Sequence, residues 1–142
     1  MPYCKIMIHA IWSTKNRTHL IGKELKPMLL QYIKENSFKK NIHIDVLNCV
    51  ADHIHLLISL GADQTIAKTI GLIKGESSNW VNKQNFSSSK FEWQDEYIAL
   101  SVSVSMVEKV RSYIGRQEEH YKKKTFTEEY DEFIKSSGLL LG

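Results

Sequence analysis

Apolar residues along the chain alternate between short runs and helix-spaced repeats. Short runs rich in β-forming residues predict strands at residues 3–12, 41–50, 53–60 and 91–101. Apolar positions three and four apart predict amphipathic helices at residues 22–40, 64–82 and 105–123, with a shorter helical segment at 127–135. The two-residue link Ala51–Asp52 joins the second and third strands, which indicates a hairpin.

The order of these elements predicts an α+β fold. Two split β-α-β units in succession form a ferredoxin-like antiparallel sheet with helices on one face, and a last helix then follows the sheet. The chain has 142 residues, which suits one domain over residues 1–142. We expect the end of the chain, residues 136–142, to be a flexible tail.

Composition narrows the class of protein only slightly. The formal net charge of +3 permits a nucleic-acid partner without requiring one. Cys4 and Cys49 form no CxxC pair, and no apolar run approaches the roughly 20 residues of a membrane span. We therefore expect a soluble, intracellular protein with reduced thiols and no membrane partner.

A pair of histidines is the first candidate for chemistry. His53 and His55 are two residues apart in a predicted strand, so their imidazoles lie on the same face. Two neutral imidazoles on one face can form half of a metal site. The alternative is two strand histidines that are satisfied by hydrogen bonds.

The last long helix carries the second candidate, Tyr113 with Gln117. Residues four apart lie one turn from each other on one helical face. A tyrosine phenol can act as a covalent nucleophile, and a glutamine oxygen can bind a hard metal ion. The alternative is a partly buried tyrosine beside a solvated glutamine. Gly115, between them, disfavours a helix by roughly 1 kcal/mol relative to alanine. It marks flexibility, close approach of DNA or neutral drift.

Basic and polar residues form the third candidate, a set of contacts to DNA phosphates. Such side chains follow the first strand, lie on the second helix and end the last one. A lysine run at a helix end can instead simply complement the helix dipole. The candidate DNA-binding residues are Lys15, Asn16, Arg17, Lys74, Lys122 and Lys123.

Taken together, these segments resemble a known family. The segment HAIWSTKNR at 9–17 resembles its first strand and turn, DHIHLL at 52–57 resembles the HUH motif, and YIGRQ at 113–117 resembles its tyrosine helix. In this order, over about residues 3–130, the chain resembles the single-tyrosine HUH transposases of insertion sequences and their REP-associated relatives.

The resemblance implies an enzyme that cleaves and rejoins single-stranded DNA at element ends, after recognising DNA hairpins. Tyr113 would be the nucleophile of a 5′-phosphotyrosine intermediate. His53, His55 and Gln117 would hold a divalent ion, Mg²⁺ or Mn²⁺. Family members are homodimers whose sites can combine two chains, and this sequence is compatible with Tyr113 acting in cis or in trans. The expected location is the cytoplasm of a bacterium or archaeon, at the nucleoid.

Three alternatives remain at this stage. A replication initiator or relaxase uses the same chemistry, although the chain has no room for a helicase domain. A domesticated, non-catalytic protein would bind single-stranded DNA hairpins without cutting them. A ferredoxin-like zinc or RNA-binding module would need further soft ligands, for which His120 and Cys49 are the candidates.

Overall fold

The computed structural model describes residues 3–86, 89–117, 128, 131–132 and 135. The chain forms two successive β-α-β units and a last helix, and an eight-residue strand opens the first unit. The elements are β1 (Ile6–Ser13), the 3₁₀ turn η1 (Lys15–Arg17), α1 (Leu25–Lys39), β2 (His43–Val50), β3 (His53–Leu60), α2 (Ile66–Lys83), β4 (Ile98–Val102), the 3₁₀ turn η2 (Val104–Met106) and α3 (Val107–Gly115).

The four strands form one antiparallel sheet in the order β2-β3-β1-β4. This is the ferredoxin-like order, so the predicted α+β fold is confirmed. β3 is a central strand, paired over its whole length with β1 and hydrogen-bonded to β2 on its other side. The register sets His53 opposite Ser13 and His55 opposite Ile11. The expected hairpin of β2 and β3 is present.

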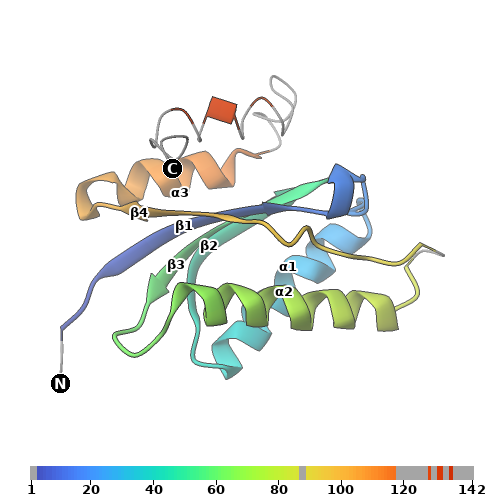
Figure 1. The fold of residues 1–142 in the computed structure, drawn as a ribbon, viewed down its shortest axis with the longest axis horizontal. Helices are drawn as coiled ribbons and strands as arrows, with labels where there is room; N and C mark the ends of the chain where they lie inside the picture. Colours follow the sequence, from blue (N-terminus) through green and yellow to red (C-terminus); the bar gives the residue numbers. More distant parts are fainter. Residues whose placement is uncertain (1–2, 87–88, 118–127, 129–130, 133–134, 136–142) are drawn as a thin grey trace.

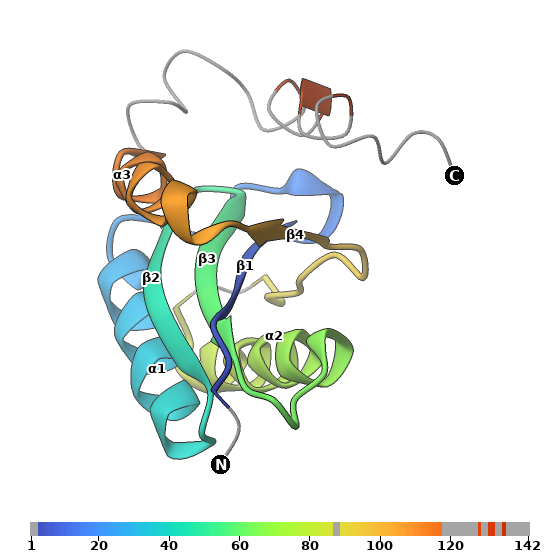
Figure 2. The same ribbon diagram turned by 90° about the vertical axis from the view of Figure 1, so that its left-hand side faces the viewer.

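Alternating side chains divide the sheet into two faces. Ile54 and Leu56 of β3 join the larger core under α1 and α2, which includes Leu29 and Ile33 of α1 and Ile70 of α2. The opposite face is covered by α3 (Figures 1 and 2). Since α1 and α2 share one face, the predicted two-layer arrangement is confirmed, and the tyrosine-bearing helix forms a third layer.

Two kinds of contact hold α3 against the sheet. Val107 and Ile114 of α3 pack with Leu57 of β3 in a small buried cluster. Arg111 of α3 donates two hydrogen bonds of 2.7 Å to the Asp45 carboxylate of β2. The Arg111 guanidinium holds the pKa of Asp45 below its usual value of 3.8. The ion pair therefore contributes fully to stability at neutral pH, and this contribution is lost as the pH falls through the lowered pKa of Asp45.

The predicted strand at 91–101 is wrong in its first half. β4 begins at Ile98, and the preceding segment meets β1 only through an isolated bridge between Thr14 and Trp93. Phe91 and Trp93 are buried in the helix-side core, where the Trp93 Nε1 donates to the Ser77 hydroxyl at 2.9 Å. Phe91 and Trp93 are therefore aromatic because they pack in the core, and the pattern that predicted a strand from residue 91 was misleading.

The predicted helix at 105–123 begins two residues later than expected and is interrupted at Arg116, while its end at 118–123 lies outside the described residues. α3 begins at Val107, after η2, and ends at Gly115 with Arg116 as its C-cap residue. The Asn48 side chain of β2 donates to the carbonyl oxygens of Ile114 and Gly115 at 3.0 and 3.4 Å. These carbonyls are thereby satisfied at the point where the regular helix is interrupted.

The other predicted strands and helices agree with the structure to within three residues at each end. The predicted helical segment 127–135 lies mostly, and the tail 136–142 wholly, outside the described residues. In the part of the chain that is described, no helix has both the length and the hydropathy to cross a membrane.

Asp45→Asn should loosen α3 while leaving the sheet intact, because the neutral amide loses the paired charge. We expect amide hydrogens of residues 107–115 to exchange about two- to fivefold faster, as for loss of a partly exposed ion pair. Hydrogen exchange followed by mass spectrometry measures this change. Glu108→Gln is the control, since Glu108 is an exposed second partner of Arg111 on α3 itself. Equal exchange in both variants would contradict a docking role for Asp45.

Candidate active site

The two histidines of the HUH segment lie on the face of β3 that α3 covers. His53 and His55 are 2% and 0% exposed, and their ring centroids are 5.3 Å apart. Ile54, between them, points into the opposite core. The strand period therefore delivers two neighbouring imidazoles to one buried place, as the sequence predicts.

Each of these imidazoles has its Nδ1 atom engaged. Nδ1 of His53 lies 2.8 Å from the Asp52 carboxylate, and Nδ1 of His55 lies 2.9 Å from Nε2 of His9. The Nε2 atom is consequently the ring nitrogen that each histidine can offer to a ligand. Partners on the second nitrogen are typical of histidines that bind metals.

Gln117 meets the first histidine. Its side chain is 1% exposed, and its Oε1 lies 3.4 Å from Nε2 of His53. Its own Nε2 donates to the Tyr113 carbonyl at 3.3 Å, which fixes the orientation of the amide. When His53 donates from Nδ1 to the Asp52 carboxylate, its Nε2 and the glutamine oxygen present lone pairs to each other. A cation or a proton between the two atoms relieves that opposition.

Tyr113 of α3 lies beside the histidines of the same chain. Its ring is half-buried, and the ring centroid is 5.7 Å from that of His55 and 6.1 Å from that of His9, edge-on in both cases. The structure thus brings together all four residues predicted for the site: His53, His55, Tyr113 and Gln117.

The end of α3 differs from the expected single helical face. Asn48 caps α3 at its end at Gly115, a turn follows at Arg116, and the Oε1 atom of Gln117 beyond this turn lies against His53. A Cβ at Gly115 would meet no atom within 4 Å. Crowding inside this chain therefore does not require glycine at this position.

Three contributors to the site had no role assigned from the sequence. Asp52 orients His53, His9 contacts His55, and Asn48 holds the end of α3. Asp52 directly precedes the first histidine in the turn of the hairpin, which is a signal that could have found it. His9 and Asn48 come from other strands, and only the sheet register brings them to the site.

The donor set suits an ion that keeps several water ligands. Within the described residues, no group of three or more His, Cys, Asp or Glu side chains is arranged to hold a metal. The candidate ligands are therefore two imidazole nitrogens and one amide oxygen. Mg²⁺ characteristically retains waters and takes few protein ligands, whereas imidazoles alone favour softer ions.

Comparison with known proteins decides the family. The family described as "Transposase IS200 like" (Y1_Tnp) matches residues 3–117, most of the chain and all of the site described above. The chain belongs to the IS200-like transposase family. The resemblance inferred from the HUH and tyrosine segments is confirmed.

Relatives of known name support this assignment. The chain is 27% identical to the transposase for insertion sequence element IS200 of Salmonella typhimurium over 119 residues, covering 80% of this chain and 78% of the relative. It is 24% identical to the ISDra2 transposase TnpA of Deinococcus radiodurans over 115 residues, covering 77% and 81%.

Solved structures share the fold. A Deinococcus radiodurans protein described as a transposase matches with a TM-score of 0.65 at 21% identity, covering 82% of this chain and 93% of the other. A REP-associated tyrosine transposase bound to a REP hairpin matches with a TM-score of 0.61 at 15% identity, covering 82% and 69%. At these identities the likeness concerns the fold.

The turn after β1 lies beside this transposase site. Lys15 pairs with Glu92 at 3.0 Å, and the Asn16 backbone N–H donates to the Gln94 side chain at 3.1 Å. Asn16 and Arg17 both have positive φ, 57° and 55°, so the turn is tight. Contact of these residues with DNA stays a prediction, and Lys122 and Lys123 lie outside the described residues.

Lys74 of α2 binds the backbone of the segment that precedes β4. Its ammonium donates to the carbonyl oxygens of Gln94 and Asp95, and it lies 6.0 Å from the centroid of the Trp12 ring. Burial lowers the pKa of Lys74, and the charge of Asp95 opposes this effect. Lys74 therefore stabilises the segment before β4, whereas its predicted contact with DNA is untested.

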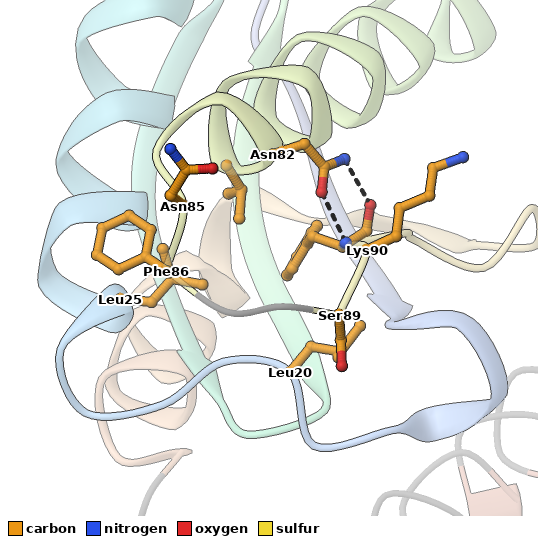
Figure 3. Close-up of a pocket in the computed structure, with 9 residues that line it drawn as sticks. Leu20, Leu25, Asn82, Asn85, Phe86, Ser89 and Lys90 are labelled. Atoms are coloured by element: carbon orange, nitrogen blue, oxygen red, sulfur yellow. Dashed lines mark hydrogen bonds between the residues drawn. The ribbon is translucent and has the colours of Figure 1, made fainter.

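Two of the hollows in the structure have different linings. One, of about 360 Å³, lies between α1, the end of α2 and the loop after it, where two hydrogen bonds join Asn82 to Phe91 (Figure 3). It is on the helix side, away from the histidines. The other, of about 320 Å³, is lined by Ile11 and Ser13, the cross-strand neighbours of the two histidines, together with Arg17 and Tyr97. The second hollow therefore lies beside the histidine pair.

Lys74→Met should loosen the segment at residues 93–97, since methionine keeps the length of the side chain but donates no hydrogen bond. We expect chymotrypsin to cut after Trp93 or Tyr97 about fivefold faster or more. Lys68→Met, on the exposed surface of the same helix, is the control and should leave the cleavage rate unchanged. Identical rates in the two variants would contradict this role of Lys74.

Proposed function

We propose that this IS200-like transposase cleaves and rejoins single-stranded DNA through a covalent bond to Tyr113. The observation that carries the proposal is the grouping of Tyr113 and Gln117 of one end of α3 with two buried histidines whose Nδ1 atoms are both engaged. A nucleophile next to oriented imidazoles and a buried amide oxygen fits phosphoryl transfer.

Tyr113 would attack the scissile phosphate with its hydroxyl oxygen. A bond forms between that oxygen and phosphorus, and the bond from phosphorus to the DNA 3′-oxygen breaks. The phenol loses its proton, and the leaving oxygen gains one to become a 3′-hydroxyl. The 5′-phosphotyrosine conserves the phosphodiester bond, so a second 3′-hydroxyl can displace Tyr113 without ATP.

His53, His55 and Gln117 would hold a divalent ion beside the phosphate. The opposed lone pairs of His53 Nε2 and Gln117 Oε1, 3.4 Å apart, support this assignment. A bound Mg²⁺ or Mn²⁺ would supply Lewis acidity that stabilises negative charge on the phosphate oxygens. Asp52 and His9 keep the imidazoles oriented toward that place.

The DNA substrate would carry hairpins near the element ends. Support comes from the REP-associated tyrosine transposase of the same fold, which is bound to a REP hairpin. In this chain, the hollow lined by Asn16, Arg17 and Tyr97 beside the histidines could take unpaired bases, and the neighbouring basic turn could contact phosphates.

The site is proposed to assemble within one chain. Tyr113 lies 5.7 Å, between ring centroids, from His55 of its own chain, and Arg111 pairs with Asp45 of the same chain. These contacts favour the cis arrangement over the composite site. The homodimer expected from the family stays a prediction.

Tyr113→Phe should abolish the covalent adduct, because phenylalanine has no nucleophilic oxygen. Hairpin DNA from the flanks of the gene, labelled at its 5′ or 3′ end, is incubated with Mn²⁺ or Mg²⁺ and separated on a denaturing gel. The wild-type protein should retain the 3′ label and release a 5′-labelled fragment with a 3′-hydroxyl. EDTA should prevent both products.

Tyr121→Phe is the matched control and should still form the adduct. An adduct that persists in Tyr113→Phe but disappears in Tyr121→Phe would identify the other tyrosine as the nucleophile. Binding of several flanking hairpins with no adduct under either metal would favour a non-catalytic hairpin-binding protein.

Mixed dimers distinguish the cis site from the trans site. One protomer carries Tyr113→Phe and the other carries both His53→Ala and His55→Ala. A site within one chain predicts no cleavage, since each protomer then lacks one half of its machinery. Cleavage by a verified mixed dimer, in contrast, would show that Tyr113 works with the histidines of the partner.

A further inference from the structure

A third histidine lies behind the proposed metal site. His9 of β1 is 4% exposed, and its Nε2 lies 2.9 Å from Nδ1 of His55, with the two ring centroids 5.1 Å apart. On β1, His9 lies between Leu57 of β3 and Leu100 of β4 in the sheet register. A buried imidazole between two paired strands has little freedom to move.

The direction of this hydrogen bond determines what His55 can do. A neutral imidazole carries one N–H, so only one of the two facing nitrogens can be the donor. If His9 donates, Nδ1 of His55 is the acceptor and its Nε2 carries the proton, which blocks a metal. If His55 donates, its Nε2 has the lone pair that a metal requires.

The neighbouring histidine provides a reference for this choice. Asp52 can only accept when it is ionised, so His53 donates from Nδ1 and presents Nε2. His55 has no carboxylate at the corresponding place; it has His9. The Nδ1 atoms of the two imidazoles therefore face different partners, a carboxylate and a second imidazole.

We infer that His9 is a positioning residue that accepts a hydrogen bond from Nδ1 of His55 and thereby presents Nε2 of His55 to the metal. The inference rests on the proposed metal site. His9 itself is not counted among the ligands, because its Nε2 atom contacts Nδ1 of His55. In the metal-free protein His55 is already in the Nδ1–H form, so no change of tautomer is needed when the ion binds.

The first measurement is the tautomer of His55 in metal-free wild-type protein. Long-range ¹H–¹⁵N correlation spectra, recorded at about pH 8.5 where imidazoles are ordinarily neutral, distinguish an Nδ1–H ring from an Nε2–H ring. The resonances of His55 are assigned by their loss in His55→Gln. We expect the Nδ1–H form. An Nε2–H ring in the wild-type protein would overturn the inference.

The second measurement is Mn²⁺ affinity in variants of His9. His9→Leu removes the acceptor, and we expect His55 to shift toward Nε2–H and the affinity to fall about 10- to 100-fold. His9→Gln carries an amide oxygen able to replace Nε2, so it should recover most of the affinity and the Nδ1–H form. His43→Leu, on an exposed residue at the start of β2, is the control for loss of an imidazole.

The outcomes separate the inference from the function on which it rests. Wild-type protein that binds neither Mn²⁺ nor Mg²⁺ would contradict the metal site, while the tautomer still decides the role of His9. A folded His9→Leu variant with wild-type affinity would overturn the positioning role alone. If His9→Leu does not fold, the comparison of His9→Gln with wild type and the wild-type tautomer decide the question.

Discussion

The strict two-residue alternation of β3, a strand paired on both sides, is the constraint on which the site depends. Ile54, Leu56 and Ile58 fill the core under α1 and α2, so the odd-numbered positions must face α3. A shift of the register by one residue would bury the histidines among the aliphatic side chains and expose the core. The stability of the sheet thus fixes the direction of both imidazoles.

The remaining parts of the site are added to this fixed pair from three directions. Asp52 comes from the hairpin turn, His9 from the neighbouring strand, and Gln117 from the end of α3. α3 buries two side chains, fewer than the four of α1 and the five of α2, and its other attachments are an ion pair and the Asn48 hydrogen bonds. The proposed nucleophile therefore lies on the helix that buries the fewest side chains.

The sequence predicts what depends on local pattern. Strand period places His53 beside His55, and helical spacing places Tyr113 near Gln117, although the helix ends between them. It fails where tertiary contacts outweigh local preference. Trp93 packs into the core while its backbone forms only an isolated bridge with Thr14, and Asn48 satisfies the carbonyls at the end of α3. His9 could not be assigned a role because its partner is 46 residues away.

Because α3 buries few side chains, we expect it to detach at a lower temperature than the one at which the sheet unfolds. The histidine pair belongs to a four-stranded sheet with a large core, whereas Tyr113 depends on one ion pair and a few buried side chains. Elements with few buried contacts open at a lower free energy than the core. Warming would consequently release α3 first, and the protein would lose its chemistry over a temperature range in which the sheet is still folded.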